Sequence, residues 1–342
     1  MKIGIVGYQG SGKSTLFHWL TGVAPDPSLA HTTQAATAEV PDKYIEPLCK
    51  IYSPKKVTLA SVNIVDTPGL SRDHQGSAGK LALIREAGCL VVVVGAFSGA
   101  EPIADLRNFE DDLLLADLDI LSGRVERLRE SVKKPRPNRE KEQEELAALE
   151  PLVDVLEQGT SLRDIELTTE QNRAIKSFQL FSQKPRLVVI NLPDDETDLN
   201  KYGSEAPGGI PLVSVSISLQ MELSKMSAEE RAAFCEEMSV STFDAGDLLR
   251  KMMEVSGQML FYTAGEPEVR TWMLRRGGTA EEAAGGIHTD LARGFIRAET
   301  MNVEDLIRLG SEREIKAHNL LRKEPKDYVV QDGDILHILS NV

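Results

Sequence analysis

Residues 7–14 constrain the fold of this chain more than any other segment. They spell Gly-Tyr-Gln-Gly-Ser-Gly-Lys-Ser, follow an apolar run at residues 2–6 and precede a helical pattern at residues 15–21. A glycine-rich loop between a strand and a helix directs backbone N–H groups and the positive end of the helix dipole towards phosphate. We therefore expect a nucleoside triphosphate here, with Lys13 on the β- and γ-phosphates and Ser14 on Mg²⁺. The predicted nucleotide contacts in this segment are Gly7, Tyr8, Gln9, Gly10, Ser11, Gly12, Lys13, Ser14 and Thr15.

The predicted fold class is α/β, because short β-branched runs alternate with helical patterns. Near-continuous apolar strands separated by helices indicate a parallel sheet covered on both faces, which is a doubly wound domain. Ligands of such domains bind beyond the carboxyl ends of the strands. Asp66 and Asn191 lie at two of these ends, and the predicted nucleotide site extends to Ser216 and Ile217 at a third. The five runs are residues 2–6, 61–65, 90–94, 187–190 and 212–216.

Composition excludes several classes of protein. A length of 342 residues suits two or three domains, and 41% apolar residues are enough for a real core. The net charge of −14 argues against a protein that coats nucleic acid nonspecifically. The longest apolar block is too short to span a membrane, and the N-terminus lacks the apolar core of a secretory signal. Three scattered cysteines indicate no disulfide framework, and we expect a cytoplasmic monomer without membrane contact.

Residues 111–182 interrupt the spacing of the strands and are predicted to form an inserted antiparallel helical hairpin. Apolar residues recur there at alternating steps of four and three, and residues 134–138 contain two prolines that separate the arms. Residues 124–141 include eight basic and three acidic residues, whereas residues 142–157 include six acidic and no basic ones. One interpretation of the basic arm is a nucleic-acid patch. We favour the other, in which the two arms pair with each other across the hairpin.

From about residue 257 the pattern predicts a small α+β module. Thr279 is expected to cap a helix there. Strands of this module are expected at residues 269–274, 294–300, 328–330 and 335–339. The predicted domains are an α/β domain at residues 1–110 and 183–256, a helical hairpin at 111–182, and the C-terminal module at 257–342.

Asp66-Thr67-Pro68-Gly69 closes the second strand. An acidic residue at this strand end is placed to hold Mg²⁺ through water, and the Gly69 N–H is placed to contact the γ-phosphate. Leu70 follows at the position where many GTPases carry the glutamine that orients the attacking water. Because leucine can neither donate nor accept a hydrogen bond, we expect slow intrinsic hydrolysis.

Two further segments are candidates for the same site. Thr33, or its neighbour Thr32, could complete the Mg²⁺ shell, although either could also be an ordinary loop threonine. Asn191, Leu192 and Asp194 occupy the guanine-recognition pattern N-K-x-D but lack its lysine. The aspartate could accept hydrogen bonds from guanine, whereas loss of the lysine stem removes one wall of the base slot. The residues therefore leave ATP and GTP both open.

The full pattern resembles the YchF (Obg-like) ATPase family of translation-factor-class P-loop proteins over nearly the whole chain. The resemblance is specific because it rests on several motifs besides the phosphate-binding loop. These are residues 66–70 (DTPGL), 115–119 (LADLD), 261–265 (FYTAG), 287–290 (IHTD), 294–299 (GFIRAE) and 327–334 (DYVVQDGD). The resemblance implies a G domain, an inserted coiled coil, a β-grasp-like C-terminal TGS domain, NTP hydrolysis and ribosome association.

The chain also departs from that family. The family also carries a hydrophobic residue at the Leu70 position, but it typically has Glu where this chain has Asp194, and it typically favours ATP. The loop has Tyr8-Gln9-Gly10 in place of Leu-Pro-Asn, and residues 97–102 are shorter and lack the histidine proposed there to assist hydrolysis. His74 could substitute as a catalytic group beside Lys13 and Gly69, or it could be a solvated loop histidine.

The leading hypothesis is a slow Mg²⁺-dependent NTPase, with ATP favoured over GTP, that acts as a nucleotide-dependent switch on the ribosome. The alternative is a nucleotide-stabilised module that binds the ribosome or RNA and hydrolyses NTP only incidentally.

Overall fold

The computed structural model describes residues 2–29, 32–72, 77–97 and 101–341. The chain divides by its internal contacts into two compact units, one of Met1–Ala36 with Asn63–Asp244 and one of Thr37–Val62 with Ala245–Val342. This division differs from the predicted domains, because residues 37–62 and 245–256 join the C-terminal module and not the α/β domain. The hairpin groups with the first unit, so contacts alone do not separate it as a third domain.

Among the described residues, the first unit contains a seven-stranded sheet with the order β2-β4-β1-β5-β6-β8-β7. Its strands are β1 (Lys2–Val6), β2 (Gln34–Glu39), β4 (Ser61–Asp66), β5 (Cys89–Gly95), β6 (Arg186–Asn191), β7 (Glu205–Ala206) and β8 (Ile210–Val215). The five predicted runs are β1, β4, β5, β6 and β8, and neighbours in the series β4-β1-β5-β6-β8 pair in parallel. The edge strand β7 pairs antiparallel with β8.

Strand β5 shows why the sheet is covered on both faces. All seven of its residues are buried. Leu90, Val92 and Val94 pack with the helices α3 (Ser77–Ile84) and α4 (Pro102–Ser131), and the intervening valines, which point to the opposite face, are buried too. Helix α1 (Lys13–Thr21) packs against β1 and against α7 (Ile217–Leu223). The doubly wound α/β fold class is therefore confirmed.

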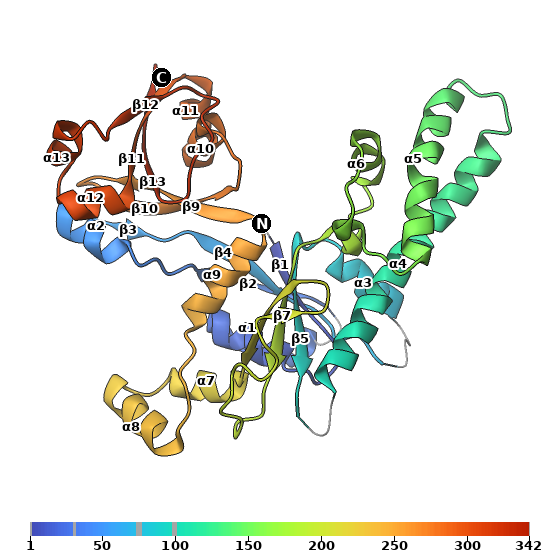
Figure 1. Ribbon diagram of the computed structural model, residues 1–342, viewed down its shortest axis with the longest axis horizontal. Coiled ribbons are helices and arrows are strands. Elements are labelled where there is room, and N and C mark those ends of the chain that lie inside the picture. Colours follow the sequence, from blue (N-terminus) through green and yellow to red (C-terminus); the bar gives the residue numbers. More distant parts are fainter. Residues whose placement is uncertain (1, 30–31, 73–76, 98–100, 342) are drawn as a thin grey trace. The chain divides into compact units, whose positions relative to one another are not determined.

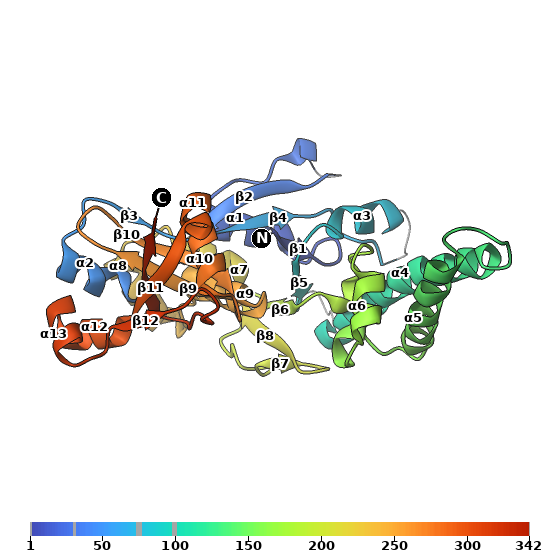
Figure 2. The same cartoon turned by 90° about the horizontal axis from the view of Figure 1, so that it is seen from above.

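The inserted hairpin consists of α4 and α5 (Arg139–Glu157), which lie side by side (Figures 1 and 2). Helix α4 is longer than predicted, because it begins at Pro102 and not near residue 111. Its first half carries Leu106, Phe109 and Leu113 into the core of the sheet. One continuous helix therefore belongs to both the core and the hairpin. The seam between the two helices is formed by Leu121, Val125, Leu128, Leu149, Leu152 and Leu156.

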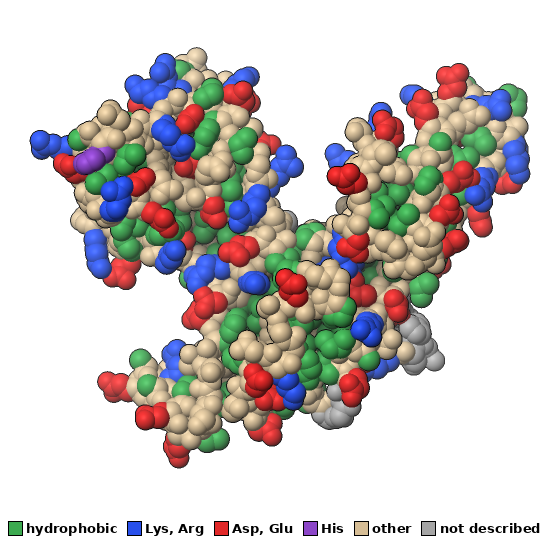
Figure 3. All heavy atoms as spheres, viewed as in Figure 1, with side chains coloured by type: hydrophobic (Ala, Val, Ile, Leu, Met, Phe, Trp, Pro, Cys, Tyr) green, Lys and Arg blue, Asp and Glu red, His purple; other side chains and the backbone are tan. Residues whose placement is uncertain are grey.

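Opposite charges of the two arms meet across the hairpin. Arg124 Nη2 lies 2.7 Å from Glu145 Oε2, and Arg129 Nε lies 2.7 Å from Glu150 Oε1. Basic and acidic side chains are interspersed along the hairpin on the face shown in Figure 3. These pairs support the interpretation that the arms pair with each other. Partly exposed pairs contribute only roughly 0.2–1 kcal/mol each, so the apolar seam is the main source of the hairpin's stability.

The remaining elements of the first unit are short. They are η1 (Pro27–Leu29), η2 (Leu162–Asp164), α6 (Thr169–Ile175), η3 (Phe181–Gln183) and α8 (Ala228–Met238). Across both units, no helix within the described ranges is long and apolar enough to cross a bilayer.

The second unit contains, among its described residues, a six-stranded sheet with the order β12-β11-β13-β9-β10-β3. Its strands are β3 (Val57–Thr58), β9 (Gln258–Ala264), β10 (Val269–Arg275), β11 (Phe295–Asn302), β12 (Arg322–Glu324) and β13 (Asp334–Ser340). Its helices are α2 (Ile45–Tyr52), α9 (Ala245–Val255), α10 (Ala280–Ile287), α11 (Thr289–Arg293), α12 (Val303–Leu309) and α13 (Glu312–Ala317). The predicted helix is present, and Thr279 caps it in a capping box with Glu282.

The predicted strand at residues 328–330 is wrong. Within the part of the chain that the structure describes, the segment forms no ladder, and an isolated bridge joins Val329 to Thr279. The backbone groups bind the turn before α10 and its first residue, since Ala280 N donates to Tyr328 O at 2.9 Å and Val330 N donates to Gly278 O at 3.0 Å. The segment with the β-branched pair Val329-Val330 therefore bonds to the backbone at the start of α10 and not to a neighbouring strand.

Residues 37–62 are joined to the second unit by contacts with segments far away in the sequence. Tyr52 Oη donates to Glu312 Oε1 at 2.8 Å, and Tyr262 Oη donates to an Asp42 oxygen at 3.0 Å. Ala60 N donates to Thr271 Oγ1 at 2.7 Å in the buried part of the same unit. The segment that follows α1 and β2 in the sequence therefore packs with the C-terminal sheet.

Candidate functional site

The glycine-rich loop joins β1 to α1 in a conformation that requires glycine. Gly12 has a φ of 101°, and a Cβ atom built there would lie 2.2 Å from Asn191 Nδ2. Gly7 has a φ of 143°, and its Cβ would lie 2.3 Å from the Val93 carbonyl oxygen. Both positions therefore exclude a side chain. The loop leads directly into the N-terminus of α1, where free N–H groups favour an anion.

Lys13 is the first residue of α1, and only 6% of it is exposed. Its Nζ donates to the Tyr8 carbonyl oxygen at 2.8 Å. Burial lowers the pKa of Lys13 to about 8, and the nearby Asp66 carboxylate opposes that shift. A buried ammonium group gains strongly from an anionic partner, so this position suits a phosphate ligand.

Ser14 and Asp66 lie beside each other next to the loop. Ser14 Oγ donates to Asp66 Oδ2 at 2.6 Å. The other oxygen, Asp66 Oδ1, is buried and has no hydrogen-bond partner among the described residues. Burial raises the pKa of Asp66, and a nearby cation would offset that unfavourable burial of charge. These oxygen ligands fit Mg²⁺, which binds through few protein groups and keeps water and phosphate oxygens.

A cavity of about 300 Å³ opens next to these groups. Within the described ranges, no three or more His, Cys, Asp or Glu side chains are grouped so that they could hold a metal by themselves. A bound Mg²⁺ would therefore depend on phosphate oxygens as well as on protein oxygens. The cavity is lined by Gln9, Gly10, Lys13, Ser14, Pro25, Asp26, Pro27, Leu29, Thr32, Gln34, Asp66, Thr67, Pro68 and Gly69.

The two threonines and the histidine singled out in the sequence have different positions. Thr32 lines the cavity, and its Oγ1 donates to the Leu29 carbonyl oxygen at 3.3 Å. Thr33 is described but is not among the lining residues. His74 lies outside the described residues. Thr32 is therefore better placed than Thr33 to reach a metal in this cavity.

The predicted base-recognition residues meet at the ends of β6 and β8. Asn191 Nδ2 donates to the Ser11 carbonyl oxygen at 3.1 Å, and Asn191 Oδ1 accepts from Ile217 N at 3.1 Å. Ser216 Oγ donates to Asp194 Oδ1 at 2.5 Å. Leu192 differs from the others, because its side chain is buried in the hydrophobic core under the sheet. That side chain is therefore not available as a wall of a base slot.

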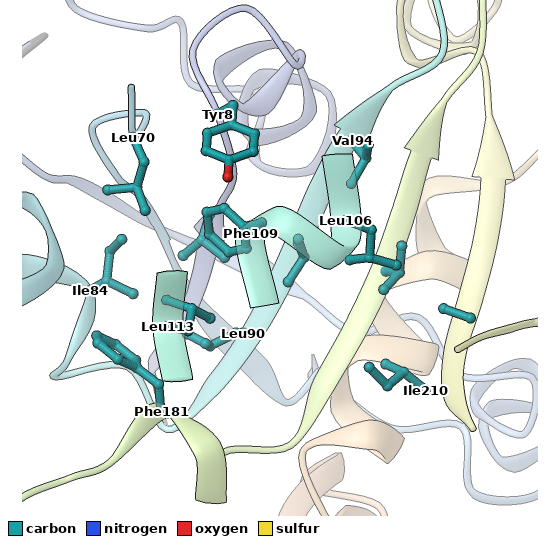
Figure 4. Close-up of a cluster of buried hydrophobic side chains, with 14 of the residues drawn as sticks. Tyr8, Leu70, Ile84, Leu90, Val94, Leu106, Phe109, Leu113, Phe181 and Ile210 are labelled. Carbon is teal, nitrogen blue, oxygen red and sulfur yellow. The ribbon is translucent and has the colours of Figure 1, made fainter. Parts of the chain in front are cut away.

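Leu70 is fixed to the phosphate-binding loop by its backbone and to the core by its side chain. Its N–H donates to Gly7 O at 3.1 Å, and its carbonyl oxygen accepts from Gln9 N at 3.0 Å. The side chain is fully buried, in the cluster that also contains Ile84 and Leu113 (Figure 4). It therefore points away from the cavity and cannot orient a water molecule there.

Curated proteins match this chain along its entire length. "Ribosome-binding ATPase YchF" of Bacillus subtilis is 31% identical over 370 residues, covering 100% of this chain and 100% of that protein. The chain belongs to the YchF/Obg-like ATPase family. "Obg-like ATPase 1" of Oryza sativa subsp. japonica is 32% identical over 367 residues, covering 100% of this chain and 92% of that protein.

Family models and a solved structure agree with membership of the YchF family. A model described as "50S ribosome-binding GTPase" matches residues 2–122. A model for the C-terminal region of YchF GTPases, described as "Protein of unknown function (DUF933)", matches residues 259–341. The structure of the Schizosaccharomyces pombe YchF GTPase is 26% identical, with a TM-score of 0.84, covering 99% of this chain and 97% of that chain. The chain is thus a nucleotide-binding protein of the P-loop NTPase class.

One contact of this YchF family member was missed by the sequence analysis. Tyr8 Oη donates to Asp112 Oδ2 at 2.8 Å, and its ring meets Phe109 edge to face at 5.4 Å between centroids (Figure 4). Arg72 lies over the Tyr8 ring and forms an ion pair of 2.6 Å with Asp105. The loop is therefore tied to the first half of α4. The only signal in the sequence was the departure of Tyr8 from the leucine usual in the family.

Leu70→Gln is expected to destabilise this YchF family member without increasing its rate of hydrolysis. The new amide would replace a fully buried apolar side chain, and an unsatisfied buried amide with lost apolar burial costs about 2–4 kcal/mol. Urea denaturation and the single-turnover rate measure the two effects. A rise in kcat without loss of stability would show that this side chain can face the cavity.

Proposed function

We propose that this YchF family member binds Mg²⁺ with ATP or GTP in the 300 Å³ cavity and hydrolyses the triphosphate slowly. The observation that carries the proposal is the convergence of Lys13, Ser14 and Asp66 on that cavity. One carboxylate oxygen there is buried without a partner, and one ammonium group is buried with a carbonyl oxygen as its hydrogen-bond acceptor. Both features favour a ligand that carries an anion and a divalent cation together.

The proposed mechanism gives each residue one task. Backbone N–H groups of residues 7–14 and the Lys13 ammonium group hold the phosphates, and the Gly69 N–H contacts the γ-phosphate. Ser14 and Asp66, with Thr32 or Thr33, would hold Mg²⁺, which when bound neutralises the charge that develops on the phosphate oxygens. Leu70 offers no group to orient water, so turnover is slow. His74 stays a proposed catalytic group outside the described residues.

We also propose that the protein is a nucleotide-dependent switch that associates with the ribosome. The support is that a relative covering the whole chain is named a ribosome-binding ATPase, and that the model matching residues 2–122 is described as a 50S ribosome-binding GTPase. Contacts with the γ-phosphate would hold the segments next to Thr32 and Gly69 in place, and loss of the γ-phosphate would release them. A cytoplasmic monomer is the proposed form.

A second candidate function is a ribosome-binding or RNA-binding module in which nucleotide serves only as a structural ligand. Burial of Leu70 away from the cavity favours it, because this side chain cannot orient the attacking water at the position where many GTPases carry glutamine. Sedimentation with purified ribosomes in the presence of a diphosphate, a triphosphate analogue or no nucleotide distinguishes the two. Binding that is the same in all three states supports the module, and binding that depends on the γ-phosphate supports the switch.

The experiment that tests the proposed activity is competition of ATP and GTP for the purified protein with Mg²⁺ present, measured by calorimetry. We expect tighter binding of ATP, since Leu192 supplies no lysine stem and its side chain is buried. Tighter binding of GTP would instead mean that Asn191 and Asp194 recognise guanine without the lysine. Failure to bind either nucleotide would contradict the proposed function.

A further inference from the structure

Gly69 occupies a crowded position beside the phosphate-binding loop. A Cβ atom built there would lie 2.8 Å from Lys13 Nζ and 2.9 Å from the backbone nitrogen of Gln9. Gly69 also lines the cavity that contains Lys13 and Asp66. The residue is therefore close enough to the predicted γ-phosphate position for its own N–H to act on the ligand.

The carbonyl group of Gly69 has an ionic partner on another element. Lys80, on α3, donates from Nζ to Gly69 O at 2.8 Å. The following peptide N–H, that of Leu70, donates to Gly7 O at 3.1 Å. The peptide after Gly69 is thus held at both of its polar groups, one by the loop and one by the lysine.

Glycine has the widest backbone freedom of any residue, so the direction of the Gly69 N–H relative to the following peptide depends on how firmly that peptide is held. Lys80 supplies such a restraint through a charge-assisted hydrogen bond, which is stronger than a neutral one. It also brings a second positive charge near Lys13.

We propose that Lys80 is a positioning residue for the γ-phosphate, which holds the Gly69 carbonyl so that the Gly69 N–H faces the terminal phosphate. The inference rests on the proposed NTPase function and deepens it. Leu70 is buried and cannot act in the cavity, whereas Lys80 Nζ lies 2.8 Å from the carbonyl oxygen of the residue before it. Because the Gly69 N–H serves only the γ-phosphate, Lys80 distinguishes triphosphate from diphosphate.

The test compares Lys80→Met and Lys80→Arg with the unmodified protein. Methionine keeps the length of the apolar stem but removes the donor, and arginine keeps a charged donor. Lys225→Met is the matched control, since Lys225 is exposed and pairs with Glu222. Calorimetry measures the Kd of a non-hydrolysable triphosphate and of the diphosphate, single-turnover assays measure the rate of hydrolysis, and thermal unfolding checks folding.

We expect Lys80→Met to weaken triphosphate binding and slow hydrolysis, each by about tenfold, as for loss of a charged hydrogen bond. Diphosphate affinity should stay within about twofold, the range of a small local change. Lys80→Arg should recover part of both losses. An unchanged ratio of triphosphate to diphosphate affinity in Lys80→Met, whether both affinities stay the same or both fall equally, would overturn the inference. If the unmodified protein binds no triphosphate, the proposed function itself fails.

Discussion

Lys13→Ala is expected to lower triphosphate hydrolysis by a factor of about 10²–10³, the range for removal of one charge-stabilising donor from a catalytic site. The Lys13 amine is buried beside the cavity and lies near the Asp66 carboxylate. Among the described residues that line the cavity, Lys13 is the only lysine or arginine. Triphosphate affinity should fall with the rate, and both are measured on the purified protein by calorimetry and single-turnover assay.

The effect of Lys13→Ala on folding should be small. Burial lowers the pKa of Lys13, which means that folding disfavours the charged form of this amine. Removing the charge therefore offsets part of the free energy lost with the packing of the side chain. Thermal unfolding should show a Tm close to that of the unmodified protein. Lys225→Ala, on the exposed surface, is the control. Hydrolysis at the unmodified rate in Lys13→Ala would mean that the active site lies elsewhere.

Asp117→Ala is expected to lower the free energy of unfolding by about 3–5 kcal/mol, because it removes one partner of a buried ion pair. Asp117 is fully buried on α4, where the helix leaves the core for the hairpin. Its Oδ1 accepts from Arg85 Nη1 at 2.9 Å, and its Oδ2 accepts from Ser182 N at 2.7 Å. The substitution leaves a guanidinium group and a buried N–H without this carboxylate. Urea denaturation measures the loss.

Asp119→Ala is the matched control for Asp117→Ala. Asp119 lies on the same helix two positions further on and is exposed, so the expected change is within about 0.5 kcal/mol. Asp117→Asn, which keeps the shape but removes the charge, should fall between the two. Equal losses for Asp117→Ala and Asp119→Ala would show that the ion pair contributes nothing to the junction of core and hairpin.

Much of the fold could be predicted because its signals are local. The run of valines in β5 indicates a strand buried on both faces. A threonine followed three positions later by a glutamate, Thr279 and Glu282, indicates the start of a helix. The phosphate-binding loop is equally local, since its glycines are required by the positive φ angles at Gly7 and Gly12. Such features depend on residues a few positions apart, so the sequence alone contains them.

The candidate site was predicted in part, for a related reason. The carboxyl ends of parallel strands lie at one edge of the sheet, so residues at the ends of β1, β4 and β6 are brought together however the connecting helices pack. This logic led to Lys13, Asp66 and Asn191. It could not show that Leu192 is buried in the core or that Lys80 reaches Gly69, because the direction of a side chain depends on what packs against it.

Membership of a compact unit was decided only by the tertiary structure. Residues 37–62 lie in the sequence between the phosphate-binding loop and Asp66, yet they belong with the C-terminal sheet. The hydrogen bond from Tyr52 to Glu312 joins residues 260 positions apart, and the residue pattern of neither segment predicts it. The five parallel strands of the α/β sheet, the hairpin and the phosphate-binding loop could be predicted from the sequence alone, since they depend on residues close together in the chain. The tertiary structure decided which segments share a core, because burial depends on contacts between residues distant in the chain.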